Sequence, residues 1–175
     1  MKLSKRKRRA GSEQAASRAA RTAFSIEERR TLEVRTVLVV EDEPDVLGVI
    51  DLSLRLLGKL DVVAVANFAE ALEAIGRRRP DVILLDRMLP DLDGLEGCRR
   101  LKADPESSGI PIVFLSARSD PADVKAGMEA GADGYLTKPF DPVVLSQRIT
   151  AILKDRDEHA RQTARKAPRG RRRRR

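Results

Sequence analysis

Five polar side chains stand directly after short apolar runs of the sequence. They comprise three carboxylates, one hydroxyl and one amine: Glu41, Asp42, Asp86, Ser116 and Lys138. Carboxylates gathered in one place repel, so without a cation at least one of them is expected to have a raised pKa. A hard divalent ion such as Mg²⁺ relieves that repulsion through oxygen ligands. With a lysine opposite, these residue types suit the positioning and charge neutralisation that phosphoryl transfer requires.

Whether these side chains meet depends on the elements that carry them. From residue 35 onward, five runs rich in Val, Ile and Leu recur without polar alternation, which is typical of parallel strands covered on both faces. The runs are Thr36–Val40, Asp61–Val65, Val82–Leu85, Ile112–Leu115 and Gly134–Thr137. Between them, and after the last, apolar residues recur at the spacings of three and four that indicate helices. The last helix is predicted to begin with Asp141 as N-cap and Pro142 at its first position.

This alternation predicts an α/β fold, a doubly wound five-stranded parallel sheet with five helices on its two faces. In such sheets, sites form at the carboxyl ends of the strands near the topological switch point. Taken alone, Asp86 would more commonly be a turn former, and Lys138 a solvated surface lysine. The joint placement of the polar side chains at several strand ends of one sheet is what indicates a site.

The composition bounds the class of protein. The chain has 175 residues and one cysteine, Cys98, so an internal disulfide is excluded and a reducing compartment fits. Cys98 lies on the apolar stripe of an expected helix and is predicted to pack in the core. The longest apolar runs are far shorter than the roughly 20 residues that a membrane span needs. We therefore expect a cytoplasmic protein without a membrane span.

The net charge of +8 is distributed unevenly: residues 1–34 carry +6, residues 35–154 carry −5 and residues 155–175 carry +7. This pattern predicts a mostly disordered basic tail at 1–34 and an acidic folded domain at 35–154. Residues 155–175 are expected to hold the end of the last helix and an Arg-rich tail. Three interpretations of the tails stay open: solvated ends, weak nonspecific binding of nucleic acid, and attraction to an anionic membrane surface.

Four segments together resemble the response-regulator receiver domains of bacterial two-component signalling, the CheY-like family. They are VLVVEDEPDV (37–46), PDVILLDRMLPDLDG (80–94), IPIVFLSAR (110–118) and GADGYLTKPFD (131–141). The resemblance covers about residues 35–154. It implies a flavodoxin-like sheet with strand order 2-1-3-4-5, and a cis peptide bond between Lys138 and Pro139.

The resemblance also implies a role for each matching residue. Asp86 would be the phosphoryl acceptor, Lys138 would pair with one phosphoryl oxygen, and Ser116 would donate a hydrogen bond to another. Mg²⁺ would be held by Asp42, Asp86 and the backbone carbonyl of Met88, with Glu41 reaching it through water. Tyr135 would be the aromatic switch, whose ring moves inward as the phosphoryl group draws Ser116 toward it.

The function implied is that of a phosphoacceptor switch that assists its own phosphorylation and dephosphorylation, and not of an enzyme. Its expected partners are a sensor histidine kinase or phosphotransfer protein and a downstream protein target, with a homodimer also compatible with the sequence. The output surface is expected around residues 124–129, Tyr135 and the last helix. The alternative is a nucleic-acid-associated regulator that binds through its basic tails.

Two further classes are less well supported by the residues. Phosphatases with an aspartate nucleophile commonly have a second acid two residues later, where this chain has Met88. A receiver that has lost phosphorylation would typically lack Asp42, Asp86 or Lys138, and all three are present. We also predict that Met88 and Arg118, at the edge of the site, slow hydrolysis of the aspartyl phosphate by obstructing the attacking water.

Overall fold

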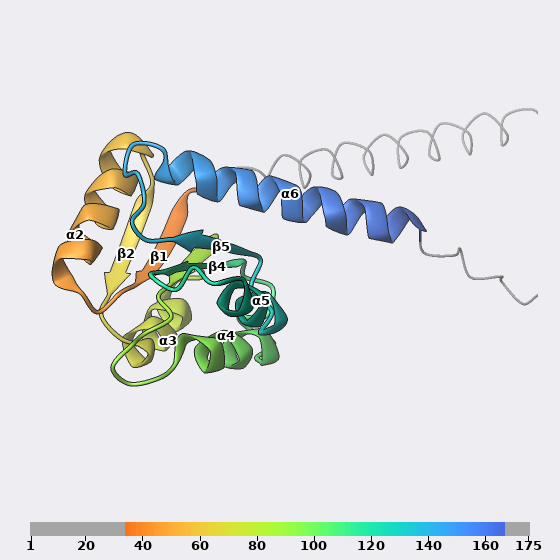
Figure 1. The fold of residues 1–175 in the computed structure, drawn as a ribbon, viewed down its shortest axis with the longest axis horizontal. Coiled ribbons are helices and arrows are strands. Elements are labelled where there is room, and N and C mark those ends of the chain that lie inside the picture. The colour runs from red at the N-terminus through yellow and green to blue at the C-terminus, as the bar shows by residue number, and fades with distance from the viewer. Residues whose placement is uncertain (1–33, 167–175) are drawn as a thin grey trace, which may run out of the picture. The chain divides into compact units, whose positions relative to one another are not determined.

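The structure is a computed structural model and describes residues 34–166; the tail predicted at 1–34, except for Val34, and the Arg-rich end at 167–175 lie outside the described residues. Strands and helices alternate along the described range (Figure 1). The strands are β1 (Thr36–Val40), β2 (Asp61–Val65), β3 (Val82–Leu85), β4 (Ile112–Ser116) and β5 (Gly134–Thr137). The helices are α2 (Pro44–Leu52), continued by a π-helical turn, η1 (Ser53–Leu57), then α3 (Phe68–Arg77), α4 (Gly94–Ala103), α5 (Pro121–Glu129) and α6 (Leu145–Lys166).

The five strands form one parallel sheet in the order β2-β1-β3-β4-β5, which confirms the predicted fold class and strand order. The topological switch point lies between β1 and β3, because the chain leaves β1 toward one edge and returns to β3 on its other side. Val40, the last residue of β1, pairs with Leu85, the last residue of β3. The carboxyl ends of these two strands therefore open at the same place.

Side chains of each strand alternate between two hydrophobic cores, one on each face of the sheet. Val37 and Val39 of β1 pack in the core that α2, η1 and α6 cover, whereas Leu38 and Val40 pack in the core beneath α3 and α4. Figure 1 shows the helices divided between the two faces in this way. Cys98 of α4 is fully buried as predicted, and this burial raises the pKa of its thiol to about 11.

The last helix differs from its predicted start. It begins at Leu145, and residues 142–144 form a turn. Asp141 does act as a local acceptor, since its Oδ1 accepts a hydrogen bond from the Val143 amide at 2.9 Å. The Asp141–Pro142 signal thus starts a tight turn that leads into the helix, and the α-helical hydrogen bonds begin with Arg148 N to Val144 O at 2.9 Å.

Within residues 34–166, no helix is both long enough and apolar enough to cross a membrane. α6 extends to Lys166, beyond the predicted domain end at residue 154, and its side chains from Glu158 to Thr163 are exposed.

Candidate phosphoacceptor site

The sheet places the predicted polar residues at one rim. Backbone hydrogen bonds continue the strand pairing past the strand ends, with Glu41 N bound to Val65 O, Asp86 N to Val40 O, and Lys138 N to Ser116 O. Because each of these residues is fixed by its own strand, their side chains converge without depending on loop conformation. Glu41, Asp86 and Ser116 are buried, at 1%, 5% and 0% exposure.

An ammonium group bridges two of the carboxylates. Lys138 Nζ lies 2.7 Å from Glu41 Oε2 and 2.9 Å from Asp86 Oδ2, with Glu43 Oε1 further away at 3.8 Å. Burial lowers the pKa of Lys138, but its hydrogen bonds to Glu41 and Asp86 outweigh burial, and the net pKa is raised. The lysine is therefore held protonated between two strand ends, where a phosphoryl group would meet it.

Glu41 is the carboxylate of the cluster whose pKa is raised. Burial, opposed by the hydrogen bond to Lys138 and reinforced by the nearby Asp86 charge, raises the pKa of Glu41 from 4.5 to about 7. The sequence predicts a raised carboxyl pKa from repulsion between carboxylates; the direction is the same, but burial is the main cause and the repulsion by Asp86 is a smaller one. Its second oxygen, Oε1, is buried and has no hydrogen-bond partner among the described residues.

These carboxylates fit a divalent cation. Glu41, Asp42 and Asp86 each offer a carboxylate oxygen within 4.8 Å of the others, and Glu41 Oε1 is a buried acceptor without a donor. A hard ion with oxygen ligands matches both the donor set and the excess of negative charge. Met88, the further ligand implied through its backbone carbonyl, lies beside the cluster, since its amide donates to Asp86 Oδ1 at 3.3 Å.

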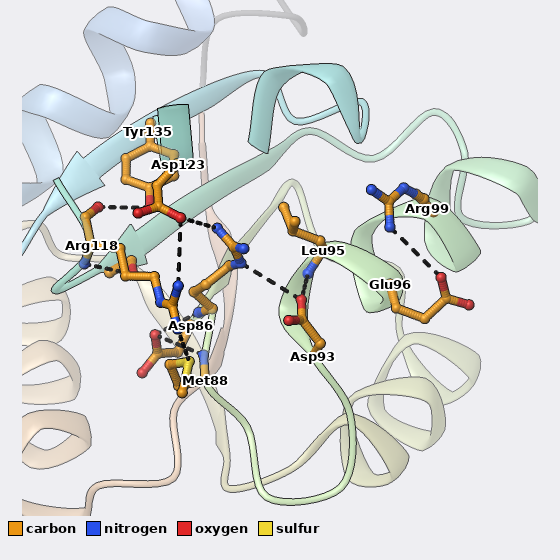
Figure 2. A network of polar contacts seen from close by, with 11 residues as sticks. Asp86, Met88, Asp93, Leu95, Glu96, Arg99, Arg118, Asp123 and Tyr135 are labelled. Carbon is orange, nitrogen blue, oxygen red and sulfur yellow. Dashed lines mark hydrogen bonds and ion pairs between the residues drawn. The ribbon is translucent and has the colours of Figure 1, made fainter. Parts of the chain in front are cut away.

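The two predicted switch residues are linked through one loop residue, Arg118. Ser116 Oγ accepts a hydrogen bond from the Arg118 amide at 3.1 Å, which leaves the Ser116 hydroxyl proton available to another acceptor. Tyr135 donates its hydroxyl proton to the Arg118 carbonyl oxygen at 2.8 Å (Figure 2). Its ring packs against Phe114 at a centroid distance of 5.8 Å.

Sequence reasoning missed Arg87 and Asp123. Arg87 follows Asp86 directly, is 7% exposed, and pairs with Asp93 and with Asp123 of α5 (Figure 2). The sequence did offer one signal: a second charged residue stands directly after Asp86, at the end of a buried strand, where an exposed side chain is unusual. Its partner lies 36 residues later, and no local pattern indicates that pairing.

An apolar pocket of about 470 Å³ opens next to the rim. It lies between the start of α2 and the connection after β5, and Lys138 forms part of its wall. Its other lining residues are Asp45, Val46, Val49, Ala117, Pro139 and Phe140. The Lys138–Pro139 peptide bond in this connection is cis, as the resemblance implies.

Comparison with known proteins decides the family. The model of the response regulator receiver domain matches residues 37–150. The chain belongs to this family. It holds a receiver domain of the two-component response regulators, and phosphorylation on aspartate and Mg²⁺ binding are general features of such domains.

Curated relatives support this assignment. The DNA-binding response regulator MtrA of Mycolicibacterium smegmatis is 42% identical over 122 residues, which cover 70% of this chain and 52% of MtrA. The transcriptional regulatory protein CseB of Streptomyces coelicolor is 46% identical over 118 residues, which cover 67% of this chain and 49% of CseB. The chain therefore spans about half the length of the curated relatives it matches.

Solved receiver structures have the same fold. A putative response regulator from Chloroflexus aurantiacus is 37% identical with a TM-score of 0.64, and the match covers 70% of this chain and 99% of that one. The receiver domain of a sensor histidine kinase from Pseudomonas aeruginosa, solved with a magnesium ion coordinated in its active site cleft, is 34% identical with a TM-score of 0.62. That match covers 70% of this chain and 99% of the other.

Proposed function

We propose that Asp86 accepts a phosphoryl group from a phosphohistidine of a sensor histidine kinase or phosphotransfer protein. The observation that carries this proposal is the position of the Lys138 ammonium between Asp86 and Glu41 at the switch point of the sheet. A carboxylate nucleophile beside a fixed cation supplies what phosphoryl transfer asks of a protein, namely position and charge neutralisation.

In the transfer, an oxygen of Asp86 forms a bond to phosphorus as the bond from phosphorus to the histidine nitrogen breaks. The electron pair of the broken bond stays on the imidazole, and an acyl phosphate forms on Asp86. Lys138 faces the negative charge on the phosphoryl oxygens, and Ser116 donates its free hydroxyl proton to one of them. The amides of Arg87 and Met88, which donate to Asp86 Oδ1, orient the carboxylate.

Mg²⁺ would be held by Asp42, Asp86 and the backbone carbonyl of Met88, with Glu41 next to it. When bound, the ion neutralises the negative charge that gathers where the carboxylates and the phosphoryl group meet. The orphaned Glu41 Oε1 and the raised Glu41 pKa support this assignment, because both mark an uncompensated carboxylate.

The signal is proposed to leave as phosphorylation-dependent contact with another protein at the surface of α5, Tyr135 and α6. The receiver domain is proposed to span residues 35–154, with α6 continuing beyond it. The relatives named as DNA-binding regulators support transcription as the process downstream. The alternative of nucleic-acid binding through basic tails is not favoured by the comparisons, and residues 1–33 and 167–175 lie outside the described residues.

The test is intact mass after incubation with Mg²⁺ and acetyl phosphate, comparing the wild type with Asp86→Asn. The wild type is expected to gain one phosphoryl group, and the variant none, because an amide cannot act as this nucleophile. A matched control is Asp91→Asn, which changes a carboxylate in the same loop that binds the first amides of α3. A wild type that gains nothing, or an Asp86→Asn protein that gains the same group, would refute the acceptor role.

A further inference from the structure

The buried guanidinium of Arg87 takes no part in the proposed phosphoryl transfer to Asp86. Arg87 stands directly after Asp86, and its side chain is only 9% exposed. A guanidinium in that position is costly unless carboxylates pair with it. The partners of Arg87 therefore indicate what holds it there.

Those partners are acids at the starts of two consecutive helices. Asp93 is the N-cap of α4, where its carboxylate accepts from the Leu95 amide at 2.7 Å, and its Oδ1 lies 3.6 Å from Arg87 Nε. Asp123 lies in the first turn of α5, and its Oδ1 lies 3.3 Å from an Arg87 terminal nitrogen. One guanidinium thus ties the loop after the acceptor to the starts of both helices (Figure 2).

The link continues into the β4–α5 connection. The same Asp123 Oδ1 lies 3.6 Å from Arg118 Nη1, while Arg118 Nη2 contacts Met88 Sδ at 3.5 Å. Both residues that follow the acceptor, Arg87 and Met88, therefore contact α5 or the loop before it. Their amides also donate to Asp86 Oδ1, so a change at this carboxylate reaches both peptide groups directly.

Tyr135 lies at the far end of this path. Its hydroxyl is bound to the Arg118 carbonyl oxygen, and its ring packs against α5 at Gly127. A Cβ built on Gly127 would lie 3.1 Å from two ring carbons of Tyr135. A movement of α5 or of its preceding loop therefore changes the space and the hydrogen bond that fix the tyrosine.

We propose that Arg87 is a positioning residue that couples the acceptor loop to α5, and through α5 and Arg118 to the ring position of Tyr135. The proposal rests on the proposed function in one respect, because phosphorylation of Asp86 is the event transmitted. The competing explanation is that Asp123 only stabilises the start of α5 through the helix dipole. In that case the loss of Arg87 would leave the surroundings of Tyr135 unchanged.

Tyr135 is the only tyrosine of the chain, so protein labelled with ¹⁹F-tyrosine gives a single resonance that reports on this ring. We would compare the unphosphorylated wild type with Arg87→Met, Asp123→Asn and the double variant. The matched control is Glu129→Gln, which removes one negative charge from the same helix at the exposed Lys125–Glu129 pair. Folding is checked in each case by amide resonances.

Each single variant is expected to shift the Tyr135 resonance, and the double variant to shift it no further than the larger single change, because both break the same path. The control is expected to leave the resonance in place. A folded Arg87→Met protein with the wild-type resonance, or shifts that simply add in the double variant, would overturn the proposal. If Arg87→Met does not fold, Arg118→Met replaces it and is judged by the same rule.

A second measurement follows the same resonance after treatment with Mg²⁺ and acetyl phosphate, with phosphorylation quantified by mass in the same sample. At equal phosphorylation, Arg87→Met is expected to show less than half the wild-type displacement of the Tyr135 signal. A full displacement in Arg87→Met would count against the coupling. Failure of the wild type to be phosphorylated would count against the acceptor role instead, and the unphosphorylated comparison would still decide on Arg87.

Discussion

Two clusters of charge lie beside Asp86, the proposed acceptor, and their charge balance differs. At the rim, Lys138 contacts Glu41 and Asp86, Asp42 adds a third carboxylate, and Glu41 Oε1 has no hydrogen-bond partner among the described residues. In the network of Arg87, Arg118, Asp93 and Asp123, two guanidiniums face two carboxylates, although Arg87 Nε also lacks a hydrogen-bond partner within residues 34–166. An excess of negative charge at the rim indicates a binding site for a cation and a phosphoryl group. A balanced cluster needs no ligand, and we infer that it serves to hold two loops together.

The largest expected effect is at the rim. Lys138→Met removes the only cation among the described residues that contacts both Asp86 and Glu41. The rate of phosphorylation by acetyl phosphate is expected to fall by about 10²–10³-fold, as when a preorganised charge is lost from a catalytic site. The rate is followed by intact mass. Lys102→Met is the control, because it removes a comparable partly buried lysine paired with Asp133. A Lys138→Met rate within a factor of about two of the wild type would contradict this role, since that change is under 1 kcal/mol in barrier.

The second prediction concerns the edge where the two clusters meet. Met88 is 56% exposed and contacts Arg118, and we expect the two side chains to obstruct the approach of water to Asp86. Met88→Asn with Arg118→Ala is expected to shorten the lifetime of the aspartyl phosphate about tenfold, which corresponds to about 1.4 kcal/mol in the hydrolysis barrier. Loss of the phosphorylated mass after removal of acetyl phosphate measures this lifetime. An unchanged lifetime would mean that these side chains do not restrict the attacking water.

The third prediction concerns pH and the charge excess at the rim. Because the pKa of Glu41 is about 7 in the folded protein and 4.5 without its surroundings, the folded state binds more protons at this carboxyl between these values. The contribution of Glu41 to the free energy of unfolding therefore falls as the pH rises from about 4.5 to about 7, and it levels off above that. Protonation of Glu41 removes a negative charge beside the proposed Mg²⁺ site, so Mg²⁺ affinity is expected to rise over this window.

Urea unfolding with chelator, at several pH values between 5 and 8, tests the stability part of this prediction. Glu41→Gln cannot ionise, and its unfolding free energy is expected to show a flatter dependence on pH than that of the wild type. Parallel pH profiles of the two proteins would show that Glu41 does not carry the shifted titration. A Mg²⁺ titration of the wild type over the same range tests the binding part.

The smallest expected effect compares two helical glycines. A Cβ at Gly76 of α3 meets nothing within 4 Å, so Gly76→Ala is expected to raise the free energy of unfolding by about 0.5–1 kcal/mol. At Gly127 the same Cβ would lie 3.1 Å from Phe114 and Tyr135, so this gain is offset by displacement of the rings. Urea unfolding of both variants measures these changes. Equal increases in the free energy of unfolding would show that α5 does not pack tightly against Tyr135.

The sequence by itself determined the sheet and the rim. Val/Ile/Leu runs indicate parallel strands, and four of the five runs are followed by polar residues of the rim, whereas β2 is partly exposed and contributes none. The convergence of Asp86, Ser116 and Lys138 therefore follows from topology without knowledge of loop structure. The same information predicted a raised carboxyl pKa from crowding, but burial is the main cause of the raised pKa of Glu41 and the Asp86 charge adds to it. The strand boundaries are local properties of the chain, which is why they could be predicted.

Only the tertiary structure decided which partners the remaining charges find. Arg87 and Asp123 are 36 residues apart, and their pairing depends on how α5 packs beside the acceptor loop. The same holds for the start of α6: the Asp141–Pro142 pattern fits both a capped helix and a tight turn, and the structure has the turn, whose Pro142 carbonyl oxygen accepts a hydrogen bond from the Ser53 hydroxyl of η1. Local patterns set the backbone of this protein, whereas the contacts between loops depend on distances that no short stretch of sequence encodes.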